Sequence, residues 1–146
     1  MEIEISAEYQ AAEVVDLYDS VGWFQYTRDA GKLLRSLKNS HCVLTARNES
    51  GRLDGLTRAL SDGETVCYVQ DLLVRPSTQR SGIGRALVEE LKRRYAGCRF
   101  FVLSTDAAGT EDAEKSHPFY RELGLIPHSE QRLEAFALPL KRQEHL

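Results

Sequence analysis

The sequence has no long apolar run, little excess charge and no apolar leader. None of its apolar runs approaches the roughly 20 residues that a membrane-spanning helix requires. The first ten residues are acidic and have no apolar centre, so we expect no secretory signal peptide. The formal net charge is only −3, which gives no electrostatic reason to expect nucleic acid or an acidic membrane as a partner. Together these absences favour a cytoplasmic protein.

Cysteine is also scarce. Only Cys42, Cys67 and Cys98 are present, no two of them have Cys-x-x-Cys spacing, and each lies in or beside a strand-like segment. No histidine lies at the spacing that would complete a zinc site with them. We therefore expect buried, reduced thiols and no metal.

The length of 146 residues is that of one domain, residues 1–146. Apolar residues alternate in some segments, which is typical of strands, and recur every three or four residues in others, which is typical of helices. The order that results is β-α-α-β-β-β-α-β-α-β-β, an α/β (α+β) fold. Pro118 interrupts the last helical segment, so a start near His117 is the alternative there. The expected strands are residues 2–5, 41–47, 53–60, 65–74, 100–104, 125–126 and 134–140, and the expected helices are residues 11–21, 31–38, 83–95 and 112–123.

Residues 71–95 combine a strand end, a glycine loop and the start of a helix. An apolar strand-like run stops at Pro76, which has no N–H for a strand ladder. Gly82 and Gly84 then lead into apolar residues at four-residue spacing. A glycine loop at a helix N-terminus presents free N–H groups and a partial positive charge. The segment therefore predicts an anion site.

Three glycine-loop patterns compete for this segment. A Walker A loop requires Lys and then Ser or Thr after its last glycine, but Arg85 and Ala86 follow Gly84. The dinucleotide-binding fingerprint requires a third glycine where Leu87 stands. The pattern Gln/Arg-x-x-Gly-x-Gly/Ala fits at every specified position, beginning at Gln79. A strand-to-helix turn that uses glycine only for packing is the alternative without a ligand.

The third pattern resembles the diphosphate-binding loop of the GCN5-related N-acetyltransferases, the GNAT superfamily. Residues 118–125 resemble a second family motif, Phe-Tyr-x-x-x-Gly-Phe, with Leu125 in place of its final phenylalanine. The predicted order of elements resembles that of the family too, so the resemblance covers nearly the whole chain. It implies the GNAT fold, a mixed and mostly antiparallel sheet flanked by helices. Looser similarities point to a small bacterial type of GNAT protein whose acceptor is unassigned.

The resemblance implies an enzyme that moves the acetyl group of acetyl-CoA directly to a primary amine. Tyr120 takes the position of the family's general acid, a phenol that hydrogen-bonds or protonates the departing thiolate. The alternative for Tyr120 is packing of its ring in the core or under the cofactor. Strand backbone should line the pantetheine arm, and loop N–H groups should hold the diphosphate. The expected cofactor-binding residues are Leu72, Leu73, Val74, Gln79, Arg80, Ser81, Gly82, Ile83, Gly84 and Arg85.

The acceptor side is less determined. Asp71 is the only carboxylate in its strand, so it is the candidate general base, but it could instead pair with Arg58 on the neighbouring strand. Asp71 and Gln70 alternate in direction unless a bulge intervenes, and ordered water could carry the proton instead. Aromatic residues 23–26 form either an acceptor wall or simple packing. The expected substrate-binding residues are Trp23, Tyr26, Arg58 and Gln70.

The sequence thus predicts an acetyl-CoA-dependent N-acetyltransferase, with a small molecule favoured over a protein as the amine acceptor. The alternative is a non-catalytic acyl-CoA-binding or sensing module on the same fold. Residues 134–140 are apolar with little charge, and Pro139 argues that they form an edge strand. A bare apolar edge is protected when identical patches meet across a two-fold axis, so we expect a homodimer.

Overall fold

The computed structural model describes residues 3–141, so the remaining residues at either end lie outside the described part. Two compact units form, of which the first ends at Ser104 and the second begins at Thr105. The expectation of a single domain, residues 1–146, stays a prediction. Within residues 3–141, no helix has the length and apolar character that crossing a bilayer demands.

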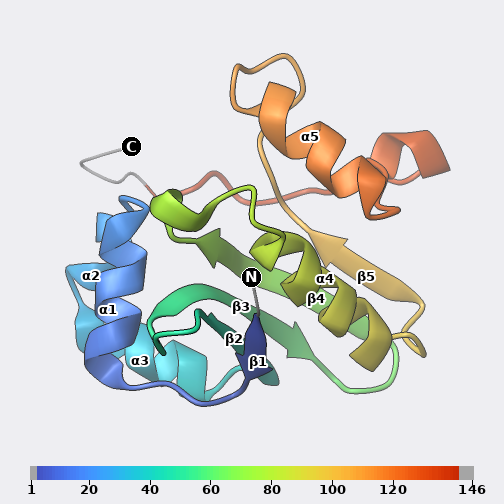
Figure 1. Ribbon diagram of the computed structural model, residues 1–146. Helices are drawn as coiled ribbons and strands as arrows, with labels where there is room; N and C mark the ends of the chain where they lie inside the picture. Colours follow the sequence, from blue (N-terminus) through green and yellow to red (C-terminus); the bar gives the residue numbers. More distant parts are fainter. Residues whose placement is uncertain (1–2, 142–146) are drawn as a thin grey trace. The chain divides into compact units, whose positions relative to one another are not determined.

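The first unit is built on a five-stranded sheet in which the strands follow one another in chain order (Figure 1). Neighbouring strands are antiparallel, except that the last two are parallel. The mixed, mostly antiparallel sheet predicted from the sequence is therefore confirmed. The expected first strand began at Glu2, which lies outside the described residues. The strands are β1 (Glu4–Ser6), β2 (Cys42–Arg47), β3 (Leu53–Ser61), β4 (Val66–Val74) and β5 (Phe100–Leu103).

Two groups of helices bury the two faces of this sheet, because each helix has one apolar side. Helices α1 (Ala11–Ser20) and α3 (Ala30–Lys38) share a core with Leu56 and Leu73 of the sheet. Helix α4 (Ile83–Arg94) packs on the other face, over residues that include Cys67. A short helix, α2 (Phe24–Thr27), forms within the aromatic connection that the sequence predicted to be irregular.

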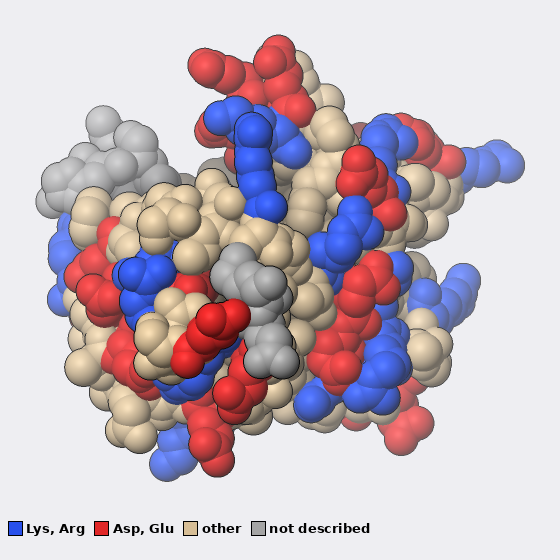
Figure 2. Space-filling model, in the orientation of Figure 1, with Lys and Arg blue, Asp and Glu red and all other residues tan. Residues whose placement is uncertain are grey.

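The solvent side of α4 carries charged residues of both signs. Arg93 and Arg94 both bind Glu90, and Lys92 binds Glu89. Figure 2 shows acidic and basic side chains mixed over this helix. The basic run at its C-terminal end is therefore compensated within its own helix.

The second unit contains α5 (Ala113–Glu122) and a 3-10 turn, η2 (His128–Gln131). Helix α5 begins well before Pro118 and includes it, so the longer of the two predicted helices is correct. The predicted strands at 125–126 and 134–140 are wrong, because these residues belong to no strand. An apolar segment permits a strand, but a strand exists only when its backbone has a partner. In this unit Phe136 and Leu138 are about nine-tenths exposed, at 92% and 88%.

Candidate functional site

A β-bulge in the middle of β4 determines which side chains face the helices. Arg58 of β3 pairs with Asp71, but the next residue, Ala59, pairs with Val69, so Gln70 is left over between them. One extra residue reverses the direction of every side chain after it. Consequently Val69 lies in the core under α4, whereas Asp71 turns to the opposite face, toward α1.

Asp71 lies in a buried polar cluster that four elements build. Its Oδ2 accepts a hydrogen bond from Arg58 Nε at 2.6 Å and another from the Tyr18 hydroxyl at 2.9 Å. Its Oδ1 accepts from the Tyr26 hydroxyl at 2.8 Å. The Asp71 side chain is 3% exposed and that of Arg58 is 7% exposed, so the ion pair is shielded from solvent. The alternative in which Asp71 pairs with Arg58 is the one that the structure shows.

The charges of this cluster are matched internally. Burial raises the pKa of the Tyr18 and Tyr26 hydroxyls, and the Asp71 charge raises it further, so both phenols stay protonated as donors. Burial is the largest single effect on Arg58 and lowers its pKa, but the hydrogen bond to Asp71, the Asp71 charge and the two tyrosines together outweigh it, so the pKa is raised. The Asp71 carboxylate thus accepts three hydrogen bonds, one of them from a cation. Asp71 therefore holds Arg58, Tyr18 and Tyr26 in one arrangement.

The predicted acceptor residues all meet at this cluster. The Arg58 guanidinium carbon lies 6.0 Å from the Tyr26 ring centre, and the Trp23 ring centre lies 6.1 Å from that of Tyr26. Gln70, exposed at the bulge, donates from Nε2 to the Tyr26 hydroxyl at 3.4 Å. Trp23 also packs edge-on against Tyr18, so it contributes to the core as well as to the wall.

Sequence reasoning missed Tyr18, which lies in the helix expected at residues 11–21. The available signal was its hydroxyl, because a fully buried tyrosine requires a hydrogen-bond partner. Ser40 was also missed. Its hydroxyl lies 3.4 Å from Arg58 Nη1 and connects the cluster to the end of α3.

Beside this cluster, β4 has a free edge. Strands β4 and β5 pair only from Val66 with Phe100 to Val69 with Leu103. In the described sheet, residues 70–74 keep β3 as a neighbour on one side and have no strand on the other. Free backbone groups on an edge can bind an extended polar chain in the manner of an added strand. Leu72, Leu73 and Val74, expected along a pantetheine arm, all lie on this segment.

The glycine loop follows directly. After a 3-10 turn, η1 (Pro76–Thr78), the backbone of Arg80 and Gly82 is left-handed, with φ of 68° and 89°. Helix α4 then begins at Ile83. Within residues 3–141, no acceptor contacts the backbone N–H groups of residues 80–84. A Cβ atom at Gly82 would meet no atom within 4 Å apart from its chain neighbours, so the space beside this glycine is open.

This loop has the properties that a diphosphate requires. Consecutive N–H groups in a left-handed turn, followed by a helix N-terminus, form a concave site of positive potential. The Gln79 side chain connects the loop to the end of β4, because its Nε2 donates to the Val74 carbonyl at 3.3 Å. The Ser81 hydroxyl is occupied too, since it donates to the Thr78 carbonyl. The side chains of Gln79 and Ser81 are thus engaged with the protein backbone, whereas the backbone N–H groups of the loop are available to an anion.

Tyr120 belongs to the second unit and lies in the last turn of α5. Its ring packs edge-on against Phe119, with ring centres 5.0 Å apart. Burial raises the pKa of its hydroxyl, and the charge of Asp106 raises it further, so the phenol keeps its proton at neutral pH. Asp106 is itself held by the Ser116 hydroxyl at 2.8 Å. Tyr120 therefore has the protonation state that a general acid needs.

Metal ligands are not gathered anywhere in the described part of the chain: no group of three or more His, Cys, Asp or Glu side chains could hold an ion. The prediction that the protein uses no metal remains a prediction.

Comparison with known proteins identifies relatives over most of the chain. Residues 5–125 match the acetyltransferase (GNAT) family. An uncharacterised N-acetyltransferase, ycf52, of Pyropia yezoensis is 30% identical over 117 residues, which is 78% of this chain and 63% of that protein. The histone acetyltransferase TAP1 of Glycine max is 39% identical over 87 residues, which is 53% of this chain and 37% of that protein. The chain thus spans between a third and two thirds of the length of these curated relatives.

Solved structures agree with these matches. A GNAT-family acetyltransferase from Streptococcus pneumoniae superposes with a TM-score of 0.78 and 29% identity, covering 97% of this chain and 98% of that one. An aminoglycoside acetyltransferase from an uncultured soil sample superposes with a TM-score of 0.69 at 22% identity, covering 97% and 100%. The second similarity, at that identity, concerns the fold alone.

Proposed function

Because the chain belongs to the acetyltransferase (GNAT) family, we propose that it transfers the acetyl group of acetyl-CoA directly to a primary amine of a small molecule. The observation that carries the proposal is the row of unbonded N–H groups at residues 80–84, which continues from the free edge of β4. The two features together match a thioester cofactor with a diphosphate at one end and an amide-containing arm at the other.

Acetyl-CoA would supply the reactive thioester, and the chain would bind and orient it. The backbone N–H groups of residues 80–84 would hold the diphosphate, and the α4 dipole would add to their attraction. The free edge at residues 70–74 would bind the pantetheine arm. An N–H from that edge, near Leu72 or Leu73, would donate to the thioester oxygen, where negative charge develops during attack.

Tyr120 would act as the general acid. When the amine nitrogen bonds to the carbonyl carbon and the carbon–sulfur bond breaks, the sulfur leaves as a thiolate. The phenol proton of Tyr120 would pass to that sulfur and produce the free thiol. The raised pKa of Tyr120 means that the phenol carries this proton at neutral pH.

On the acceptor side, we propose that Asp71 is a positioning residue. Its carboxylate accepts a hydrogen bond from the Tyr26 hydroxyl and so fixes that group. The same hydroxyl oxygen accepts a hydrogen bond from the Gln70 amide. The exposed part of the wall is therefore uncharged and built from aromatic rings and an amide. Such a wall suits the apolar body of a small amine. The proton that the acceptor ammonium must lose would leave through ordered water.

A non-catalytic acyl-CoA sensor is the second candidate, since the same loop and edge would serve binding alone. A protonated tyrosine at position 120 favours the enzyme, because binding alone gives no use for a proton donor. A protein acceptor is the other open alternative, and its support is the matched histone acetyltransferase of Glycine max.

We also propose that the protein is a homodimer. The support is the extended apolar segment at residues 134–140, in which Phe136, Leu138 and Leu140 are 92%, 88% and 86% exposed. An apolar surface of this kind typically marks an interaction site. Light scattering should give twice the monomer mass of 16.5 kDa at tens of micromolar, and a stable monomer mass would contradict the dimer.

The experiment that tests the activity is a screen of primary amines and a lysine-containing histone peptide with acetyl-CoA, following release of free thiol. We expect thiol release above background hydrolysis with at least one small amine, together with an acetylated product by mass spectrometry. Tight CoA binding without any turnover would favour the sensor. Turnover of the peptide alone would replace the small-molecule acceptor with a protein.

A further inference from the structure

The start of β3 supports the glycine loop at both of its ends. At the entrance, the Arg75 backbone N–H donates to the Asp54 carbonyl at 2.7 Å. The Arg75 carbonyl in turn accepts from the backbone N–H and the hydroxyl of Thr78, at 2.9 and 3.0 Å. The first turn of the loop is therefore fixed to Asp54 through Arg75.

At the exit, the next residue of β3 has the same role. A Cβ atom at Gly55 would lie 2.5 Å from the Cγ2 atom of Ile83 and 3.2 Å from Leu87, so α4 begins directly on this glycine. Ile83 is the first residue of α4 and is buried. Neighbouring residues of one strand thus set the position of the loop where it starts and where it ends.

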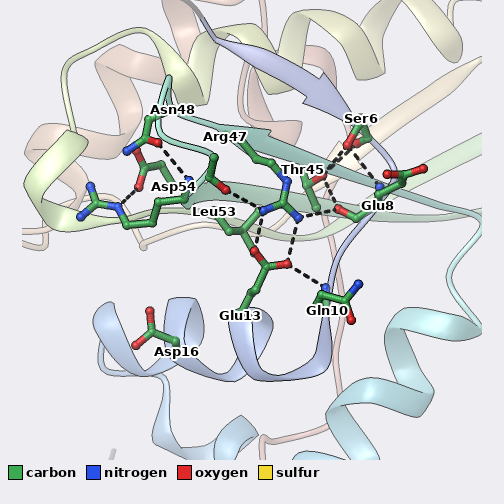
Figure 3. A network of polar contacts seen from close by, with 12 residues as sticks. Ser6, Glu8, Gln10, Glu13, Asp16, Thr45, Arg47, Asn48, Leu53 and Asp54 are labelled. Atoms are coloured by element: carbon green, nitrogen blue, oxygen red, sulfur yellow. Dashed lines mark hydrogen bonds and ion pairs between the residues drawn. The ribbon is translucent and has the colours of Figure 1, made fainter.

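The Arg75 side chain extends this support. Its Nη2 donates to Asp16 of α1 and to the Leu53 carbonyl, both at 2.9 Å. Its Nε lies 3.3 Å from Asp54 Oδ1, which also accepts from Arg52 Nε at 2.7 Å. Figure 3 shows Asp54 at the strand end and Asp16 on the helix that passes below it. Arg75 therefore lies among three acceptors, of which Asp54 is buried and Asp16 is exposed.

This ion pair is an inefficient source of stability. The Asp54 side chain is completely buried, and both its Oδ2 and Arg75 Nε are buried without a hydrogen-bond partner. Burying a carboxylate that is only half satisfied costs roughly as much as its pairing returns. The pair instead orients the Arg75 side chain, because the buried Asp54 carboxylate, Asp16 and the Leu53 carbonyl all contact its guanidinium.

From these contacts we infer that Asp54 is a positioning residue for the cofactor, which through Arg75 holds the backbone N–H groups of the glycine loop in the arrangement that binds a diphosphate. The inference rests on the proposed function. It assigns to Asp54 no contact with the cofactor or the reacting atoms. It predicts that loss of the Asp54 charge weakens binding of donors that carry the diphosphate and leaves the chemistry unchanged.

The test compares two donors, acetyl-CoA and S-acetylpantetheine, which has the same thioester but no diphosphate. In Asp54→Asn, which keeps the shape of the side chain, the Arg75 guanidinium loses the buried charge beside it, and the Kd for CoA by calorimetry should rise about tenfold. The KM for acetyl-CoA should rise equally with kcat unchanged. The kcat/KM for S-acetylpantetheine should change by less than about twofold.

Arg52→Gln is the matched control, since it removes the Asp54 partner that lies outside the loop, and CoA affinity should stay at the wild-type value. Arg75→Lys provides a second route if Asp54→Asn does not fold, because lysine keeps the charge but loses the Nε contact. Arg75→Lys should likewise raise the Kd for CoA and leave the kcat/KM for S-acetylpantetheine nearly unchanged.

An unchanged Kd for CoA in both variants would overturn the inference, and so would an equal loss with both donors, which a merely structural role produces. Failure of the wild-type protein to bind CoA would instead contradict the proposed function, so the two failures are distinct.

Discussion

Replacing Gly82 with aspartate separates a binding role of the glycine loop from a role in folding. Gly82 has a φ of 89° and open space where a Cβ would lie, so the change creates backbone strain but no collision. Left-handed backbone costs a residue with a side chain about 1–2 kcal/mol, and aspartate is at the tolerant end. The variant should therefore fold with slightly reduced stability.

The loss of affinity should be much larger. An aspartate carboxylate about 4 Å from one negative charge is repelled by about 1–4 kcal/mol, depending on solvent screening, and a diphosphate carries more than one charge. We expect the Kd for acetyl-CoA to rise at least hundredfold. At a ligand concentration of 100 times the wild-type Kd, binding stabilises the wild type by about 2.7 kcal/mol, but a hundredfold weaker variant by only about 0.4 kcal/mol.

Thermal unfolding measures this difference. For a chain of this length, 1 kcal/mol shifts the melting temperature by about 2–4 °C, so acetyl-CoA should raise Tm by about 5–11 °C in the wild type and by under about 2 °C in Gly82→Asp. Gly51→Asp is the matched control, because Gly51 has a φ of 88° and equally open space but lies in the β2–β3 turn. It should lose similar stability and keep the full shift. A full shift in Gly82→Asp as well would refute the assignment of the loop.

Three further predictions concern single side chains. Tyr120→Phe should lower kcat by roughly 10²–10⁴-fold, the contribution of a positioned proton donor, with little change in the calorimetric Kd for CoA; an unchanged kcat would leave the ring with a packing role only. Arg58→Met should reduce the free energy of unfolding by about 3–5 kcal/mol in urea titrations, because it leaves the buried Asp71 carboxylate uncompensated. The double variant with Asp71→Asn should recover part of this loss, and a purely additive result would argue against the pair. The hydrogen bonds from Arg47 hold the pKa of Glu13 at about 2, against an ordinary 4.5, so its contribution to stability is present above pH 4.5 and is lost as pH falls toward 2. Because that ion pair is partly exposed, Glu13→Gln should flatten only modestly the loss of urea stability between pH 4.5 and 2, and an unchanged slope would contradict the shift.

Local signals in the sequence were enough for the glycine loop and for most of the sheet. Gly82 adopts the left-handed backbone that glycine favours, and the apolar repeat that starts at Ile83 does form a helix. The GNAT fold could be predicted because these local patterns occur in a characteristic order. Each of them depends on residues close together in the chain.

Features that depend on pairing between distant residues could not be predicted. The bulge at Gln70 exists only in the register of β3 against β4, and it alone turns Asp71 toward Tyr18. The apolar run at residues 134–140 predicted a strand, but no strand forms, because an apolar run does not supply a partner. In both cases the missing information was the identity of the neighbouring backbone.

The central claim is that the loop and the free edge of β4 bind one cofactor together, and a crystal structure of the complex with CoA tests it most directly. We predict that diphosphate oxygens lie within hydrogen-bond distance of the backbone N–H groups of residues 80–84. We also predict that the pantetheine amides pair with the backbone of residues 70–74. A diphosphate held elsewhere, or a pantetheine arm that does not contact β4, would contradict the account.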